Sequence, residues 1–286
     1  MSRRFLRKKL QTGNDVEKII DFHTHIFPDK IAQKTIDFLS EKGGIPPFSD
    51  GSVKGLLREM EKADIETAVT LPVVTNPKQF ESVNRFALEV NGAFSDKERK
   101  LLSFAGIHPQ CEDIDGKMRW IKENGFLGVK IHPDYQDTYI ADEGYIRILE
   151  SAKEYDLIVV THSGVDEGYR NAPVRCTPEL IKRVLKKVKH SKFVLAHYGA
   201  NELFDEVFDL LCGEDLYFDT AYILRFIGEQ TFKKILEKHG EDRVLFASDS
   251  PWSSIQKDVE ILRSFSLGEA AERKIFYDNA RKLLGK

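Results

Sequence analysis

The chain has 286 residues, of which 41% are hydrophobic, and its formal net charge at pH 7 is −3. A chain of this length and composition buries a large core, as one large domain or two small ones. The near balance of charge argues against a nucleic-acid partner, which calls for a basic excess on one face. No run approaches the roughly 18 apolar residues of a membrane span, so we expect no membrane partner.

The N-terminus and the cysteines favour a cytoplasmic protein. Residues 1–17 contain a cluster of Arg and Lys, but no apolar stretch of roughly 7–15 residues follows it, unlike in a secretory signal. Cys111, Cys176 and Cys212 lie far apart, which disfavours disulfides and a thiolate zinc site. We predict a basic N-terminal arm at 1–17 and a single domain at 18–286.

Along the chain, short apolar runs alternate with amphipathic segments. The runs are rich in Val, Ile, Leu and Phe, which is typical of parallel strands buried on both faces. The predicted strands are 18–25, 65–74, 101–108, 126–132, 157–163, 192–198, 216–222 and 243–249.

Between these runs, apolar residues recur at three- and four-residue spacing, as on one face of a helix. Thr177 and Pro178 supply an N-cap and a first helical residue, and Gly43 ends another helix. The predicted helices cover 30–42, 52–63, 79–94, 142–155, 177–190 and 227–239, with closing helices in 258–285.

Eight strands, each followed by helical sequence, predict an α/β fold, a (β/α)8 TIM barrel in a single domain. The length agrees with the ~250 residues typical of that fold. A doubly wound open sheet is the main alternative. Residues 43–52, rich in Gly and Pro, read as a loop insertion, either a mobile rim or an inert surface loop.

Residues 19–25 (IIDFHTH) place two histidines at the end of the first predicted strand. Side chains alternate faces along a strand, so His23 and His25 point the same way, with Asp21 in line behind them. A divalent metal relieves the repulsion between adjacent imidazoles by binding both neutral rings. The alternative is a pair of surface histidines in a turn.

Histidines recur at the other strand ends. All strand C-termini of a barrel open onto one face, and that face carries the chemistry in barrel enzymes. Repetition on neighbouring strands therefore favours a site over isolated core histidines. Six of the eight histidines lie at or just past predicted strand C-termini: His23, His25, His108, His132, His162 and His197.

Two charged residues also fall within apolar strand ends. Lys130 shares a strand face with His132, and inside a barrel its charge must be paired or removed. The alternatives are carboxylation to bridge metals, binding of a substrate anion, and a structural salt bridge with Asp249. Asp249 in turn needs a cation, donors or a proton, unless it is a simple turn aspartate.

The predicted metal ligands are His23, His25, His162 and Asp249, with an exchangeable water completing the site. These nitrogen and oxygen ligands suit Zn²⁺ first, with Mn²⁺, Fe²⁺ or Co²⁺ as alternatives.

Five motifs, in this order, resemble the amidohydrolase superfamily, and in particular its amidohydrolase-2 branch of hydrolases and decarboxylases. They are DFHTH at 21–25, GVKIHP at 128–133, THSG at 161–164, AHYG at 196–199 and SDSP at 248–251. The resemblance spans almost the whole chain. It is highly specific for the superfamily and much less so for the reaction.

The resemblance implies a metal held by the two first-strand histidines, His162 and Asp249. His197 would act near the substrate as a proton shuttle, or as a ligand to a second metal. Lys130 stands where a carboxylated lysine bridges two ions in binuclear members. Its Lys-x-His-Pro context also occurs in members with one metal, so either one or two ions are expected.

Three functions are compatible with this pattern. The first is hydrolysis of a small, carboxylate-bearing amide, ester or lactone by a metal-activated water, with Asp249 and His197 as catalytic residues. The second is metal-dependent, non-oxidative decarboxylation of a small aromatic or unsaturated acid. The third is a non-catalytic metal-binding barrel, which an open coordination position disfavours.

The predicted partner is a small-molecule substrate. Arg175, after the fifth strand, and Arg225, after the seventh, are candidates for binding its carboxylate, together with His132. Either arginine could equally be a surface residue. The outer helices of barrels often pair, so a homodimer is a further prediction.

Overall fold

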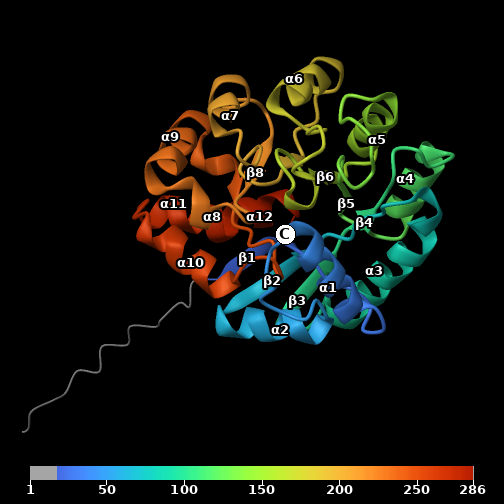
Figure 1. Cartoon of the computed structure of the whole chain (residues 1–286), viewed down its shortest axis with the longest axis horizontal. Coiled ribbons are helices and arrows are strands. Elements are labelled where there is room, and N and C mark those ends of the chain that lie inside the picture. The colour runs from blue at the N-terminus through green and yellow to red at the C-terminus, as the bar shows by residue number, and fades with distance from the viewer. Residues whose placement is uncertain (1–17, 286) are drawn as a thin grey trace, which may run out of the picture.

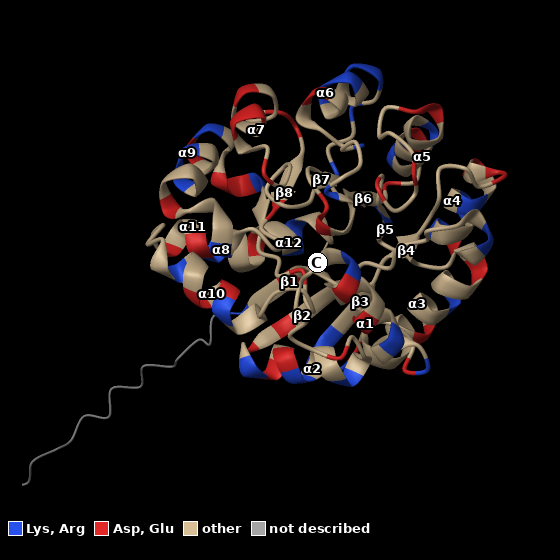
Figure 2. Ribbon diagram, viewed as in Figure 1, with Lys and Arg blue, Asp and Glu red and all other residues tan. Residues whose placement is uncertain are grey.

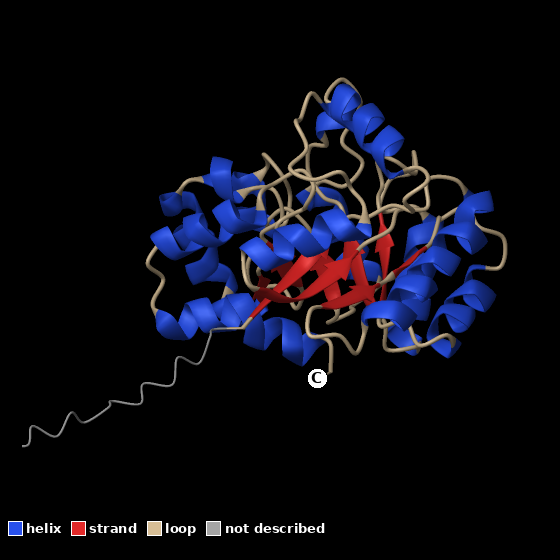
Figure 3. Ribbon diagram, turned by 90° about the horizontal axis from the view of Figure 1, so that it is seen from below, coloured by secondary structure: helices blue, strands red, loops and turns tan. Residues whose placement is uncertain are grey.

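The computed structural model describes residues 18–285, so the predicted arm 1–17 lies outside the described residues. A ring of parallel strands lies at the centre of the molecule, and the helices surround it (Figures 1 and 3). Strands and helices alternate along the chain, as in a (β/α)8 barrel. The predicted TIM-barrel fold is therefore confirmed.

The strands pair in chain order, from β1 to β3 and from β4 to β9. β3 and β4 are two parts of the predicted strand 101–108, which is interrupted at Phe104. The ring closes between its last and first strands, where the Phe22 N–H donates to Phe246 O at 2.9 Å. The strands are β1 (Ile19–Thr24), β2 (Ile65–Thr70), β3 (Lys100–Ser103), β4 (Ala105–Gly106), β5 (Gly128–Ile131), β6 (Ile158–Thr161), β7 (Phe193–Leu195), β8 (Tyr217–Asp219) and β9 (Val244–Leu245).

The helices include three that the sequence patterns did not single out, α4, α7 and the short α8. Thr177 begins α6 as predicted, since its hydroxyl accepts the Leu180 N–H at 3.3 Å. No helix in the part of the chain that the structure describes is long and apolar enough to cross a membrane. The helices are α1 (Ala32–Gly43), α2 (Val53–Lys62), α3 (Phe80–Phe94), α4 (Ile114–Glu123), α5 (Glu143–Glu154), α6 (Pro178–Lys187), α7 (Phe204–Leu210), α8 (Leu224–Ile227), α9 (Glu229–His239), α10 (Ile255–Ser264), α11 (Glu269–Arg273) and α12 (Asn279–Leu283), with short turns η1 (Pro77–Gln79), η2 (Glu167–Tyr169), η3 (Glu241–Arg243) and the π-turn η4 (Lys274–Asp278).

Alternate residues of the strands enter two hydrophobic clusters. Val159 packs with helix residues such as Ile181 in the cluster between the strands and the outer helices. Val160 joins Phe22 and Phe104 in a second cluster, in which strand residues from around the ring meet. Charged residues lie mainly on the outer helices (Figure 2). Because the barrel is filled with apolar side chains, polar groups gather beyond the C-terminal ends of its strands.

Candidate metal centre

Two imidazole nitrogens face each other at the end of β1. His23 Nδ1 lies 2.9 Å from Asp219 Oδ2, and His25 Nδ1 lies 2.9 Å from Leu71 O. Each Nδ1 therefore carries the ring hydrogen, and each Nε2 of the neutral ring offers a lone pair. These two Nε2 atoms are only 3.2 Å apart. Two lone pairs at this distance repel each other unless a cation lies between them.

Asp249 adds an oxygen to this pair. Its Oδ1 lies 3.1 Å from His25 Nε2 and 3.5 Å from His23 Nε2. The Asp249 N–H donates to His23 O at 2.8 Å, which ties the loop after β9 to β1. Burial raises the pKa of Asp249, but its contact with His25 and the nearby imidazoles of His23 and His197 outweigh burial. The net effect lowers the pKa, so the carboxyl is ionised.

The three ligand atoms fit a divalent metal. In a tetrahedral site with bonds of zinc length, neighbouring ligand atoms lie about 3.4 Å apart. The observed separations of 3.1, 3.2 and 3.5 Å agree with that spacing. His23, His25 and Asp249 are therefore the residues that would hold the ion.

Lys130 reaches the same place from β5. Its Nζ lies 3.0 Å from His23 Nε2, and the residue is 1% exposed. Burial lowers the pKa of Lys130 to about 8, although Asp219 and Asp249 oppose the shift. A substantial fraction of this amine is therefore neutral slightly above pH 8, and the neutral amine is the form that carboxylation requires.

His197 and His162 form a second pair beside the first. His162 Nδ1 lies 2.9 Å from His197 Nε2, and His197 Nδ1 lies 3.0 Å from Ala221 O. His197 and Asp249 both adopt left-handed backbone conformations, with φ of 59° and 68°. Such conformations cost of order 1–3 kcal/mol in a non-glycine residue and cluster at functional sites.

The predicted fourth ligand, His162, belongs to a different group of potential ligands. His23, His25 and Asp249 form one group, whereas His162 lies with His132 and Asp166. The rings of His132 and His162 are stacked, with their centroids 4.2 Å apart. The structure thus brings three of the four predicted ligands together and places the fourth beside them.

A cavity of about 660 Å³ opens over both groups, which suits a small-molecule ligand. His132 and Lys130 line it, and helix α1 supplies an apolar wall that includes Phe38. Part of the predicted loop 43–52 also reaches it, through Ile45. A hydrogen bond attaches this loop to the segment after β9, because the Phe48 N–H donates to Pro251 O at 2.7 Å.

Neither predicted substrate-binding arginine lines this cavity. Arg175 pairs with Asp137, and its backbone N–H donates to Asp134 Oδ1 at 3.3 Å. Arg225 donates to Trp252 O at 3.0 Å, and its guanidinium lies over the Tyr222 ring at 4.6 Å. Both side chains are occupied outside the site.

Sequence reasoning missed Asp219, which positions two of the site histidines. Its Oδ2 contacts His23 Nδ1, and its Oδ1 accepts the N–H groups of His197 at 3.0 Å and Ala221 at 3.1 Å. It was detectable as an acidic residue at the end of an apolar run, the feature that identified Asp249. Asp21, by contrast, is structural, because its carboxylate accepts the Ser248 hydroxyl at 2.5 Å.

Replacing Asp219 with asparagine is expected to weaken Mn²⁺ or Zn²⁺ binding about 10–100-fold. The amide oxygen still accepts the two backbone N–H groups, but the amide nitrogen faces His23 Nδ1. The ring hydrogen of His23 then moves to Nε2, where it blocks the ligand position. Equilibrium dialysis measures the affinity, with the exposed Asp215→Asn as the control. Equal affinities in the two variants would refute this role.

The family model described as "Amidohydrolase" matches residues 20–286. A search of curated proteins finds no match.

Solved structures share the barrel. A TIM-barrel protein from Bordetella bronchiseptica is 19% identical, with a TM-score of 0.71, over 94% of this chain and 98% of that chain. A dihydroxybenzoic acid decarboxylase from Polaromonas sp., with bound manganese and the inhibitor 2-nitroresorcinol, is 16% identical, with a TM-score of 0.66, over 94% and 97%. A probable 2-pyrone-4,6-dicarboxylic acid hydrolase from Acinetobacter baumannii, with citric acid bound, is 14% identical, with a TM-score of 0.63, over 94% and 99%. At these low sequence identities, the structural similarity shows that this chain shares the fold of these proteins.

Proposed function

The chain belongs to the amidohydrolase family of metal-dependent enzymes, and on that premise we propose that it is a hydrolase of a small amide, ester or lactone. The observation that carries the proposal is the convergence of His23 Nε2, His25 Nε2 and Asp249 Oδ1 within 3.5 Å of one another. This group lines the cavity of about 660 Å³, where a small substrate has access to it.

When bound, a divalent ion supplies Lewis-acid chemistry, lowering the pKa of water toward ~7 and polarising a carbonyl oxygen. Zn²⁺ and Mn²⁺ both suit the nitrogen and oxygen ligands. Asp249 would take the proton of the attacking water on a carboxylate oxygen and pass it to the leaving group. His197 keeps its Nδ1 on Ala221 O, so it would exchange a proton at its Nε2, once that atom gives up its contact of 2.9 Å with His162 Nδ1.

A second candidate is metal-dependent decarboxylation of a small aromatic or unsaturated acid. It is supported by the likeness of the fold to the Polaromonas decarboxylase with bound manganese. His197 or Asp249 would then protonate the carbon that loses CO₂, and no water would be consumed. A cytoplasmic location and a homodimer stay predictions from the sequence.

The metal content of protein purified without added metal or chelator is the first test. We expect about one Zn²⁺ or Mn²⁺ per chain at the first group of ligands, measured by plasma mass spectrometry, and its loss from the His23→Ala/His25→Ala variant. A wild-type protein without metal, whose activity does not respond to added Zn²⁺ or Mn²⁺, would refute the proposal.

Isotope labelling then separates the two reactions on a panel of small esters, lactones, amides and aromatic acids. In H₂¹⁸O, hydrolysis puts one ¹⁸O atom into the product acid. In D₂O, decarboxylation releases CO₂ and leaves deuterium on the carbon that lost it. Release of CO₂ without incorporation of ¹⁸O would replace hydrolysis with decarboxylation.

A further inference from the structure

Helix α1 lies inside the ring of outer helices (Figure 1) and forms part of the cavity wall. The residues that it contributes include Ile31, at its N-cap, and Thr35, Phe38 and Lys42. Steps of four, three and four residues place these side chains along one face of a helix. This cavity face of α1 is therefore the part of the helix that a ligand in the cavity would meet.

The apolar part of the cavity face is exposed. Ile31 and Phe38 are 49% and 61% exposed, whereas Ala32 and Ile36, on another side of the helix, are buried. The helix therefore packs on the protein without burying Ile31 or Phe38. Exposed apolar side chains that gather at a cavity are typical of binding surfaces. We thus expect an apolar part of the ligand to cover them.

Lys42 adds a positive charge near the C-terminal end of the cavity face. Its Nζ lies 3.5 Å from the centroid of the Tyr169 ring and 5.0 Å from that of the Tyr135 ring. The ring faces attract the ammonium, but they leave N–H groups that can still donate to an anion. In the part of the chain that the structure describes, Lys42 forms no ion pair and no hydrogen bond.

The other lysine of the cavity is engaged elsewhere. Lys130 Nζ lies 3.0 Å from His23 Nε2, within the group of potential metal ligands at the end of β1. None of the described arginines lines the cavity. Lys42 is therefore the cation of the cavity wall that is placed to meet an anionic group of a ligand.

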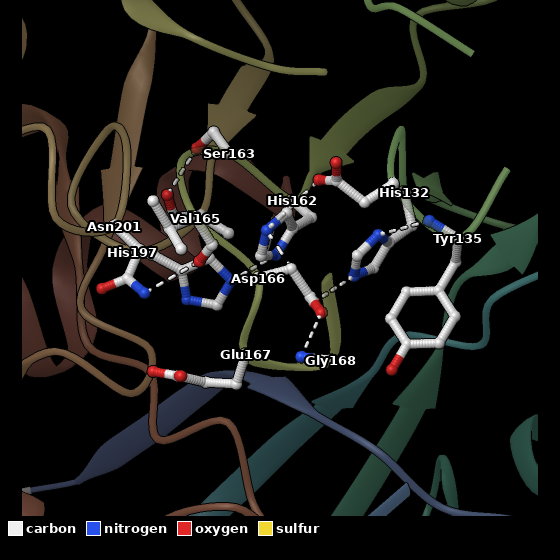
Figure 4. Close-up of polar contacts among 12 residues, drawn as sticks. His132, Tyr135, His162, Ser163, Val165, Asp166, Glu167, Gly168, His197 and Asn201 are labelled. Atoms are coloured by element: carbon white, nitrogen blue, oxygen red, sulfur yellow. Dashed lines mark hydrogen bonds and ion pairs between the residues drawn. The ribbon is translucent and has the colours of Figure 1, made fainter. Parts of the chain in front are cut away.

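The acidic residues of the neighbouring loop face other partners (Figure 4). Asp166 Oδ1 accepts a backbone N–H at 2.8 Å, and its Oδ2 lies 3.5 Å from His132 Nε2. The Glu167 carboxylate points away from Asp166 and accepts an Arg170 N–H at 2.9 Å. Neither carboxylate forms an ion pair with Lys42, so a carboxylate of a ligand can take that place.

We propose that α1 recognises the substrate, and that the substrate carries a carboxylate next to an apolar part, with the carboxylate bound by Lys42 and the apolar part packed on Phe38. The two residues are four positions apart, so one turn of about 5.4 Å separates them. The inference rests on the proposed function, because it names the class of amide, ester or lactone that the cavity accepts. It gives Lys42 the role that the sequence patterns gave to Arg175 and Arg225.

The test compares the binding of hexanoate and of its neutral amide, hexanamide, to the full-length protein as purified. Tryptophan fluorescence reports binding, because Trp252 lines the cavity. We expect hexanoate to bind at least ~10-fold more tightly than hexanamide. Lys42→Gln should lose this preference, and Lys42→Arg should keep it. The control is Lys34→Gln, which replaces an exposed lysine of α1 outside the cavity and should also keep it.

Removal of metal separates this site from the ligand group of His23, His25 and Asp249. After treatment with a chelator, wild type should still prefer hexanoate, so the result does not depend on whether the protein is a hydrolase. A preference that disappears with the metal but survives in Lys42→Gln would place the carboxylate on the metal. That outcome would overturn this inference and support the metal centre. Equal affinities of wild type for the two probes, or no binding of hexanoate, would also overturn it.

The role of Phe38 is tested by chain length. Hexanoate has four methylene groups more than acetate, so wild type should bind it at least ~10-fold more tightly. Phe38→Ser should lose most of this gain, and Phe38→Leu should keep most of it. An unchanged gain in Phe38→Ser would contradict the inference. If Phe38→Ser instead only converts a dimer into a monomer in sedimentation, the cavity face of α1 contacts a second copy of the chain, and the inference is wrong.

Discussion

Replacing Asp249 with asparagine is expected to lower turnover at least ~10²-fold while most of the metal stays bound. The amide oxygen can still face His25 and His23, so the ligand position survives. The amide cannot take the proton of the attacking water, because it is not a base at neutral pH. The measurement is kcat on a substrate identified by the screen, together with the metal content of the same sample.

Asp242→Asn is the control for this variant, because its carboxylate is exposed and pairs with Lys274 on the outer surface. It should keep wild-type turnover. Retained turnover in Asp249→Asn with intact metal would remove Asp249 from the chemistry. Loss of turnover together with the metal would make it a ligand alone.

Replacing Asp258 with asparagine is expected to stabilise the protein, and more so at high pH. Asp258, in α10, is 2% exposed, and its Oδ2 has no hydrogen-bond partner among the described residues. Burial, with Asp21 and Asp249 nearby, raises the pKa of Asp258 to about 7, although a hydrogen bond from Ser253 and the charge of Arg225 oppose the shift. The folded chain therefore keeps a proton that the unfolded chain loses near pH 3.9.

The direction of this pH dependence follows from the number of protons that each state binds. Between pH 3.9 and 7 the folded state binds more protons than the unfolded state, so stability falls as the pH rises through this window. Asparagine imitates the neutral carboxyl at every pH. The expected gain in the free energy of unfolding is about 1.5 kcal/mol at pH 5 and about 4 kcal/mol at pH 8.

Urea denaturation of metal-free protein at the two pH values measures this gain. The exposed Asp96→Asn variant is the control and should show no pH-dependent difference from wild type. A gain that is equal at pH 5 and pH 8, or a loss at both, would show that Asp258 is ionised in the folded protein.

The fold could be predicted because buried parallel strands are apolar on both faces, which makes each of them visible as a local run. The break at Phe104 was not visible, because it lies within one such apolar run. Helix α4 was missed although its buried residues Ile114, Met118 and Ile121 recur at helical spacing. Its signal is short, since the helix spans only 10 residues.

For the site, the sequence was informative where residues that can bind a metal lie close together on one strand. His23 and His25 are two residues apart, so their proximity is local, and the barrel topology alone brings Asp249 to them. The arginines were harder to place. The long side chains of Arg175 and Arg225 can reach many partners, and which partner each one meets depends on loops whose paths the sequence patterns do not specify.

Strand periodicity and chain order were enough to predict the barrel, the end of the strands at which the site lies and the residue types gathered there. Which atoms face one another became known from the three-dimensional arrangement of the loops. That arrangement placed Asp219 behind His23, and it placed His162 in a second group with His132 and Asp166. These contacts join residues far apart in the chain, and ring orientation and loop path set them rather than any local pattern.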